Sequence, residues 1–225
     1  MIKKLGRKKK KEEGWKWKGE LIEVVKKFKY LGYTLTCNND DIAHIKEQVA
    51  KSRSIMGKLW GIGERYFRND WKRRKMLFDA MCKSVLLYGV EIWGYKKYEE
   101  IEIVKKKYIK WVFKIEKCTP DYLIRREFKE HELLIGTIER AMKYEKKVIK
   151  NEESGPVYEI LRRKILKLGT MNKKDKIREK IMELYKEEWE KREMINKILI
   201  EKEKEEDMKR IKESKFIGRY KSVVE

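Results

Sequence analysis

The chain has 225 residues, of which 44% are charged, and it carries a formal net charge of +22 at pH 7. This composition allows one modest core plus extended helices, and no run approaches the roughly 18 uncharged apolar residues of a membrane-spanning helix. We therefore expect an intracellular protein that does not span a membrane. The charge predicts an anionic partner, either nucleic acid or an anionic membrane surface. Residues 1–171 carry +19 of it, so the polyanion-binding surface is expected there.

Residues 1–18 form a basic arm with nine Lys or Arg residues and two acids. Its densest part is the run Arg7-Lys8-Lys9-Lys10-Lys11. Such a run is compatible with a nuclear-localisation signal, with phosphate binding or with a merely solvated arm. A nuclear location therefore stays open.

Residues 19–36 have the pattern of a short β-hairpin. In residues 15–19, Trp and Lys alternate and a glycine follows, which predicts a turn. Residues Leu21–Leu31 are rich in β-branched and aromatic residues, and apolar and polar side chains alternate there with a period close to two. This pattern predicts a returning strand. Gly32 interrupts it, which predicts a bulge or a close backbone approach.

From residue 37 onward the apolar residues recur with helical spacing. They predict a first helix from about Asp41 to Trp60, ended by Gly61 and Gly63. A second helix follows around Trp71–Tyr88, and its broad apolar face predicts the most buried element. Candidates for the N-cap of the first helix are Asn38, Asn39, Asp40 and Asp41.

A third helix is expected over Ile101–Ile115, closed by Cys118-Thr119-Pro120 because proline cannot continue a helix. Residues 37–118 are thus one helical bundle. Further helices are expected across residues 119–171, at Tyr122–Lys129, Leu134–Lys150 and Val157–Leu168. The aromatic residues predicted to pack in the core are Trp93, Tyr108 and Trp111.

Residues 172–225 form a charged helical extension in which apolar residues are widely spaced among Glu and Lys. Three arrangements stay open: a projecting helix or coiled coil, a helix packed back on the core, and partial disorder. The predicted fold class is therefore mainly α, with a short N-terminal β-hairpin, a helical bundle and a long C-terminal helix.

The sequence shows no catalytic constellation, so we predict neither an enzyme nor a cofactor. Asp40-Asp41 resembles a helix start, which favours N-capping over metal binding. His44, one turn into the first helix, is expected to be a polar surface residue. Cys37, Cys82 and Cys118 lack the spacing of a zinc site and suit reduced thiols.

The segment Glu64–Lys75 combines bases with aromatic residues, a composition suited to neutralising phosphates and stacking on sugar or base. On a helix, Arg68, Lys72 and Lys75 would share a face. The alternative is a solvated helix end whose aromatic residues, Phe67 and Trp71, pack inward. The predicted phosphate-binding residues are Arg65, Arg68, Lys72, Arg73, Arg74 and Lys75.

Two motifs resemble segments of non-LTR (LINE-type) retrotransposon reverse transcriptases. Phe28-Lys29-Tyr30-Leu31-Gly32, followed by Tyr33-Thr34-Leu35, is similar to the FKYLG segment that closes the palm of these polymerases. Leu86-Leu87-Tyr88-Gly89-Val90-Glu91-Ile92-Trp93 is similar to their LLYGxExW segment. Residues 119–127 and 216–221 also resemble C-terminal segments of such elements. The likeness covers most of the chain and is strongest between residues 28 and 112.

The resemblance implies that Phe28, Tyr30, Leu31 and Gly32 lie at a primer grip and that residues 37–118 form a thumb-like bundle, which clasps a template-primer duplex. The family's fingers, most of its palm and its catalytic aspartates have no counterpart here. We therefore expect a non-catalytic remnant that binds an RNA/DNA or DNA duplex through its phosphate backbone. The alternative is a structural protein whose C-terminal helix forms a coiled coil with a partner or with itself.

Overall fold

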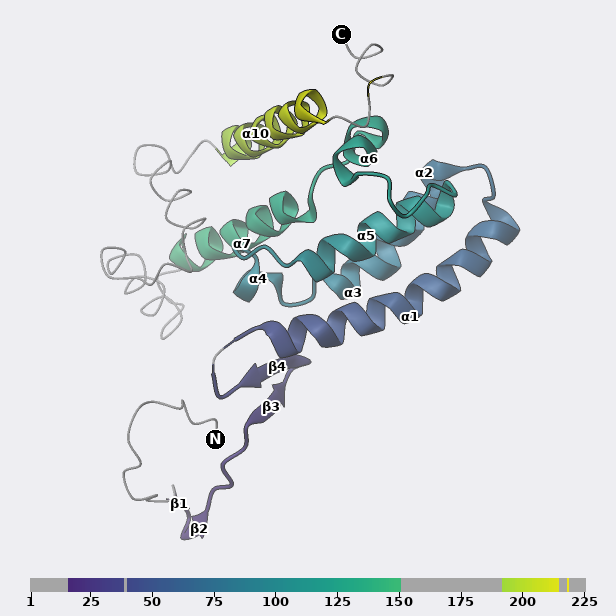
Figure 1. Cartoon of the computed structure of the whole chain (residues 1–225). Helices are drawn as coiled ribbons and strands as arrows, with labels where there is room; N and C mark the ends of the chain where they lie inside the picture. Colours follow the sequence, from purple (N-terminus) through teal and green to yellow (C-terminus); the bar gives the residue numbers. More distant parts are fainter. Residues whose placement is uncertain (1–15, 39, 151–191, 215–217, 219–225) are drawn as a thin grey trace. The chain divides into compact units, whose positions relative to one another are not determined.

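The computed structural model describes residues 16–38, 40–150, 192–214 and 218. These residues are mainly helical, with short strands confined to the N-terminal part, which confirms the predicted fold class (Figure 1). The chain divides into two compact units, Met1–Gly89 and Val90–Glu225, called unit 1 and unit 2. This boundary falls inside residues 37–118, for which the sequence predicts one bundle.

The strands form two hairpins instead of the single one predicted. Strands β1 (Lys16–Trp17) and β2 (Glu20–Leu21) pair in one, and β3 (Lys27–Tyr30) and β4 (Tyr33–Thr36) pair in the other. Both turns have two central residues with positive φ, Lys18 (46°) with Gly19 (87°) and Leu31 (45°) with Gly32 (79°). This is the type I′ geometry that matches the twist of paired strands. Gly32 therefore lies in a turn and not in a bulge, and the alternative prediction of a close approach is the one observed, since an added Cβ would lie 3.2 Å from the Tyr88 hydroxyl oxygen.

Helix α1 (Ile42–Tyr66) ends six residues later than predicted, because it continues through Gly61 and Gly63. A glycine inside a helix costs only about 1 kcal/mol relative to alanine, so packing can override it. At Gly63 the reason is visible: an added Cβ would lie 3.3 Å from Nε of Arg74. The glycine leaves room for a buried guanidinium to cross the helix.

The second predicted helix is present as α2 (Trp71–Leu77), a π-helical segment η1 (Phe78–Lys83) and a short α3 (Ser84–Leu86). η1 and α3 pack along α1. Asp70 begins this run by accepting a hydrogen bond from the backbone N–H of Arg73 at 3.0 Å, a typical N-cap. The core of unit 1 comprises Ile45, Val49, Leu59, Phe78, Cys82, Leu86 and Leu87.

Unit 2 contains the remaining helices that the structure describes. They are α4 (Val90–Trp93), α5 (Glu99–Val112), α6 (Asp121–Phe128), α7 (Leu133–Lys150) and α10 (Arg192–Glu213). The predicted helices at 101–115, 122–129 and 134–150 are thus confirmed with shifted ends. α4 packs on α7 at Gly94, where an added Cβ would lie 2.6 Å from the carbonyl oxygen of Thr137.

The predicted core aromatics of unit 2 are partly right. Trp93 and Tyr108 are each 2% exposed, whereas Trp111 is 38% exposed. Glu102 is also buried: its carboxylate accepts the backbone N–H of Leu134 at 3.0 Å at the start of α7. Burial raises the pKa of Glu102, although hydrogen bonds from the α7 backbone oppose that rise. A side chain of α5 thus caps the next long helix.

Part of the predicted C-terminal extension is described, as α10. It packs against α6 and α7, and its Ile211 is 1% exposed. For these residues the packed-back alternative is the one observed (Figure 1). The basic run at 7–11, the helix predicted at 157–168 and the rest of the extension lie outside the described residues. No helix in the described ranges combines the length and apolar character needed to cross a membrane.

Candidate nucleic-acid interface

The two motifs that resemble reverse transcriptases contact each other inside unit 1. The Tyr88 hydroxyl donates a hydrogen bond to the carbonyl oxygen of Leu31 at 2.5 Å, across 57 positions of sequence. At Gly32, an added Cβ would lie 3.2 Å from the same hydroxyl oxygen. The tip of the β3–β4 hairpin is therefore fixed by Tyr88, and glycine at position 32 permits the close approach.

His44 lies at the centre of this contact and is fully buried, so its assignment to the surface was wrong. Its ring stacks on Tyr33, with centroids 4.0 Å apart. The backbone N–H of Thr34 donates to its Nδ1 at 3.4 Å, and its Nε2 lies 3.0 Å from the carbonyl oxygen of Tyr88. These partners fit a neutral ring that carries its proton on Nε2. Burial lowers the pKa of His44, which favours the same form.

One sequence signal for this burial exists, although it is weak. His44, Gln48 and Ser52 follow one another at intervals of four and are all buried. They form a polar line directly beside the apolar line that begins with Ile45 and Val49. A polar line flanking the apolar stripe of a helix marks the edge of the buried face.

The polar face of the β3–β4 hairpin is turned toward α1. Glu47 accepts hydrogen bonds from Lys29 and, at 2.8 Å, from the Thr34 hydroxyl, and it pairs with Lys51 at 2.9 Å. The hydrogen bond from Lys29 is the main reason that the pKa of Glu47 falls to about 2. An ionised carboxylate thus joins the hairpin to the helix.

The opposite face of the same hairpin is exposed except at Tyr33, which stacks on His44. Phe28, Tyr30 and Leu31 are 49, 59 and 76% exposed, and Leu35, paired with Phe28 in the ladder, is 37% exposed. Aromatic faces of this kind can stack on nucleic-acid bases or sugars. The structure therefore leaves three of the four predicted hairpin residues accessible, and the fourth, Gly32, shapes the turn.

The predicted phosphate-binding segment lies where α1 turns into α2. Arg65, Arg68, Lys72 and Arg73 are exposed there, and Lys75 is half-buried, which lowers the pKa of its ammonium group. Arg68 lies in the turn, outside both helices, so the single helical face predicted for Arg68, Lys72 and Lys75 does not form. The segment nevertheless presents four accessible cations.

Arg74 does not belong to this accessible set, and its prediction as a phosphate-binding residue was wrong. It is 2% exposed, its Nε donates to the carbonyl oxygen of Phe67 at 3.0 Å, and its Nη2 pairs with Glu64 at 2.5 Å. Its guanidinium also lies over the Trp60 ring, 5.5 Å from the centroid. These contacts make Arg74 the structural link between α1 and α2.

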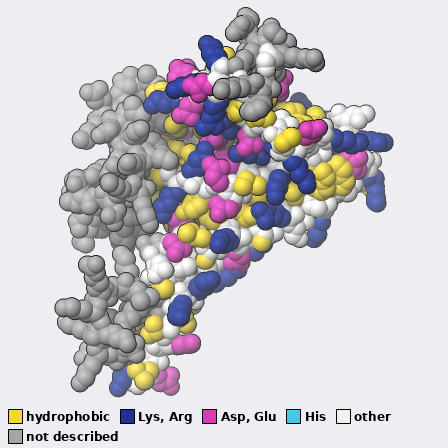
Figure 2. Space-filling view, viewed as in Figure 1, with side chains coloured by type: hydrophobic (Ala, Val, Ile, Leu, Met, Phe, Trp, Pro, Cys, Tyr) yellow, Lys and Arg dark blue, Asp and Glu magenta, His cyan; other side chains and the backbone are white. Residues whose placement is uncertain are grey.

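Three further cations on α1, Lys46, Arg53 and Lys58, were missed by sequence reasoning. With Arg65 they form the α1 basic face: Lys46 and Arg53 lie on one side of the helix, Lys58 and Arg65 lie about a third of a turn around it, and all four side chains are exposed. Small residues lie among them, namely Ala50, Ser54, Gly57 and Gly61. Both acids of α1 have cationic partners, because Glu47 binds Lys29 and Lys51 while Glu64 binds Arg74. Figure 2 shows Lys and Arg side chains along the edge occupied by α1.

Spacing was the available signal for this face. Lys46, Ala50, Arg53, Gly57 and Gly61 recur at intervals of three and four, which places them on one side of a helix. Glycine at positions 57 and 61 leaves open space, since an added Cβ would meet no atom within 4 Å. A flat, cationic helix surface allows a polyanion to approach the backbone closely.

Within the described ranges, no group of three or more His, Cys, Asp or Glu residues is arranged to hold a metal ion. No protein-family model matches the chain, and searches of curated proteins and of solved structures return no match either.

Proposed function

We propose that the chain binds a nucleic-acid duplex, RNA/DNA or DNA, through its phosphate backbone and without catalysis. The observation that carries the proposal is the α1 basic face. Four cations of this helix are exposed, and the two acidic residues of the helix already pair with other cations. Contacts to phosphates position a protein on a duplex but carry little sequence information. The expected binding is therefore tolerant of sequence.

The dimensions of α1 suit this role. Its 25 residues extend about 37 Å, whereas successive phosphates of one strand are about 3.4 Å apart along a duplex axis. Cations distributed along such a helix can follow one strand over several phosphates. The exposed cations at the α1–α2 turn extend the surface at one end, and the β3–β4 hairpin lies at the other (Figure 1).

The resemblance to non-LTR reverse transcriptases supports the same proposal from the sequence. In that family the segment similar to Phe28–Gly32 contacts the primer end, and the following helices clasp the template-primer duplex. Phe28 and Tyr30 are accessible for such contacts. On this basis the proposed duplex is a template-primer, bound by residues that correspond to the primer grip and thumb of such a polymerase.

The salt dependence of binding tests the proposal. Fluorescence anisotropy with a labelled 20-base-pair RNA/DNA hybrid gives the affinity of the full chain over a range of salt concentrations. Replacing Lys46, Arg53 and Lys58 together by Gln is expected to reduce the log–log salt slope by about 2.7, because each lost phosphate contact contributes about 0.9.

The matched control replaces three exposed lysines of unit 2, Lys107, Lys143 and Lys147, by Gln. This variant loses the same amount of positive charge. If the duplex binds specifically to α1, the variant should keep the wild-type salt dependence of hybrid binding. Equal losses in both triple variants, or a wild-type slope near zero, would contradict the proposal.

A variant that adds bulk without changing charge tests whether the shape of the α1 basic face matters for binding. Gly57→Leu introduces a side chain into open space, and leucine is a better helix former than glycine, so the fold is expected to tolerate it. Added bulk between the cations should hold the phosphates away and weaken hybrid binding. An unchanged affinity would exclude close approach at this position.

The absence of catalysis is tested separately. With a primed RNA template, Mg²⁺ and deoxynucleotides, the purified chain is expected to extend no primer. Extension that persists after removal of contaminating polymerases would contradict this part of the proposal and leave the binding surface in place.

A further inference from the structure

Unit 2 contains a cavity of about 380 Å³ between α6, the turn that follows it and the second half of α10. This volume lies within the range of roughly 300–1,000 Å³ that is typical of small-molecule sites. The lining residues come from both sides of the α6–α10 contact. The charges that line the cavity decide what it can hold.

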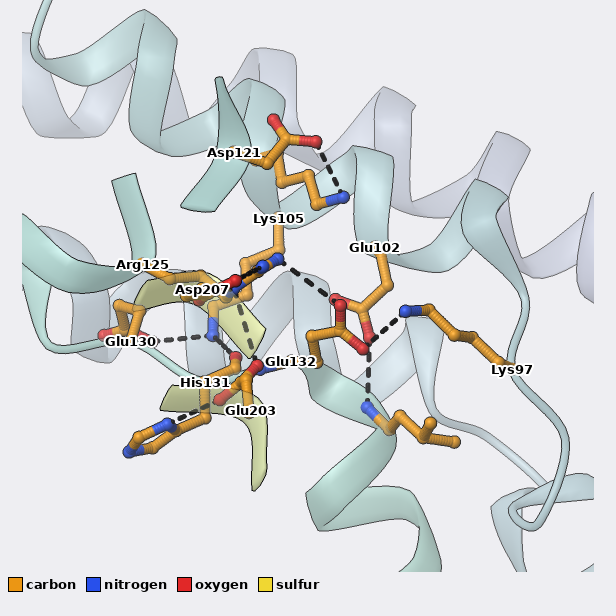
Figure 3. A network of polar contacts seen from close by, with 12 residues as sticks. Lys97, Glu102, Lys105, Asp121, Arg125, Glu130, His131, Glu132, Glu203 and Asp207 are labelled. Atoms are coloured by element: carbon orange, nitrogen blue, oxygen red, sulfur yellow. Dashed lines mark hydrogen bonds and ion pairs between the residues drawn. The ribbon is translucent and has the colours of Figure 1, made fainter. Parts of the chain in front are cut away.

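The three carboxylates of the lining are occupied by protein groups (Figure 3). Asp207 binds the Arg125 guanidinium with both oxygens, one of them at 2.8 Å from Nε. Glu203 lies 2.7 Å from Nδ1 of His131 and accepts the backbone N–H of Glu132 at 2.7 Å. Glu130 pairs with Lys105 at 2.7 Å. Each acid therefore already has a donor from the protein.

Fewer of the cations that line the cavity have an acidic partner in the protein. Lys129 and Lys204 are exposed at the cavity, and neither forms an ion pair within the described ranges. Within the part of the chain that the structure describes, the Arg126 guanidinium contacts the thioether of Met208 and forms no ion pair. These three cations come from α6, from the residue that follows it and from α10. They converge on one space from two helices.

The remaining wall is apolar. Met208 and Ile211 line the cavity, and Ile211 is almost completely buried. A ligand that fills the space must therefore satisfy several cations at one end and cover hydrocarbon at the other. Metal cations are disfavoured, because the carboxylates that would bind them are already held by Arg125, His131 and Lys105.

We infer that this cavity binds a phosphate monoester that carries an aromatic or apolar group. A monoester near neutral pH is close to a dianion with several strong acceptor oxygens, which suits a cluster of Lys and Arg. Its organic part covers the Met208 and Ile211 side. The site lies in unit 2 and does not depend on the duplex-binding surface of unit 1.

Isothermal titration of the full chain with adenosine 5′-monophosphate tests the inference, with adenosine as the uncharged comparison. One bound nucleotide per chain is expected, and adenosine should bind at least tenfold more weakly. Lys129→Gln and Lys204→Gln should each weaken nucleotide binding by about tenfold, the loss expected for one charge-assisted hydrogen bond.

Lys202→Gln is the matched control, because Lys202 is exposed on the same helix and does not line the cavity. It should leave the nucleotide affinity unchanged. Absence of saturable binding, or equal weakening by Lys202→Gln and Lys204→Gln, would overturn the inference. Circular dichroism of each variant verifies that the fold is retained.

Two sources can supply such a phosphate, a free nucleotide or the phosphorylated end of a nucleic-acid strand. An oligonucleotide with a 5′-phosphate is compared with the same strand bearing a 5′-hydroxyl. A preference for the phosphorylated strand that is lost in Lys204→Gln indicates a strand end. Equal affinity of the two strands, together with saturable mononucleotide binding, indicates a free nucleotide.

Discussion

The imidazole of His44 satisfies both of its ring nitrogens only while it is neutral. Protonation of Nδ1 would remove the acceptor for the Thr34 N–H and place a charge in a fully buried site. Because the pKa of His44 is lowered on folding, the unfolded chain binds this proton more tightly than the folded chain does. The contribution of neutral His44 to the free energy of unfolding is therefore fully present above about pH 6.5, and it is lost as the pH falls below that value.

This behaviour can be measured as the free energy of urea unfolding between pH 7.5 and 5. The wild-type chain should lose up to about 1.4 kcal/mol per pH unit below pH 6.5 from this group. His44→Phe should abolish that part of the slope, whereas His131→Gln, which changes the only other histidine, should keep it. An identical slope in His44→Phe and wild type would contradict the prediction.

Arg74 is the residue on which the α1–α2 connection depends. Replacing it by Met removes its hydrogen bonds to the Glu64 carboxylate and to the Phe67 carbonyl, which keeps only the Asp70 N–H among its described donors, and we expect a loss of about 2 kcal/mol in unfolding free energy. Arg73→Met is the matched control, because the neighbouring side chain is 65% exposed and its pairing with Asp70 contributes less than about 1 kcal/mol. Equal losses in urea unfolding would contradict this structural role.

At the scale of elements, Gly89 ends the run of helices in unit 1 with a φ of +72°. An added Cβ would lie 2.8 Å from the ring of Tyr33, closer than packed atoms approach. Gly19 has a similar φ of +87° but no atom within 4 Å of such a Cβ. Comparing the two glycines separates backbone strain from steric overlap.

Gly89→Ala should therefore destabilise the chain by at least about 1 kcal/mol more than Gly19→Ala, since overpacking adds to the cost of the left-handed conformation. Thermal or urea unfolding measures both variants. Similar losses would show that Tyr33 moves aside at little cost.

The docking of α10 depends on carboxylates. Asp207 and Glu203 lie one turn apart and bind Arg125, His131 and the start of α7, while Ile211 is the one fully buried apolar side chain among the α10 residues whose burial is described. Asp207→Asn should therefore raise amide hydrogen exchange in α10 by about tenfold or more, equivalent to about 1.4 kcal/mol. Glu206→Gln, at an exposed position of the same helix, should leave exchange unchanged. Full protection in Asp207→Asn would show that apolar contacts suffice.

At the scale of the whole molecule, the chain divides into two compact units, and each has buried apolar residues of its own, on α1 in unit 1 and on α4 and α7 in unit 2. Calorimetry of the full chain should therefore show that Arg74→Met shifts one part of the unfolding transition and Arg125→Met shifts another. A single transition displaced equally by both substitutions would indicate that the units unfold together.

The helices were largely predictable from the sequence, because apolar residues at helical spacing and breakers such as Pro120 act locally. Helix ends were less predictable. Gly61 and Gly63 look like terminators, but α1 passes through both, since Gly63 makes room for an arginine eleven positions later. No local pattern contains that information.

The candidate interface was predictable in composition but not in detail. Charge and aromatic content indicated the region around residues 65–75, yet burial of Arg74 follows from a tertiary contact with Glu64 and Phe67. The α1 basic face was present in the spacing of Lys46, Arg53 and the glycines. The density of bases does not reveal this face, because the densest cluster lies at residues 65–75, and only their periodicity along α1 does.

The orientation of the β3–β4 hairpin has a consequence for the behaviour of the chain in solution. Phe28 and Tyr30 face outward on an edge strand that has one partner within the described residues, a combination that promotes self-association. Lys27 and Lys29 alternate with them along β3. A second hairpin aligned edge to edge would bring like charges together, so these lysines also act as gatekeepers against aggregation.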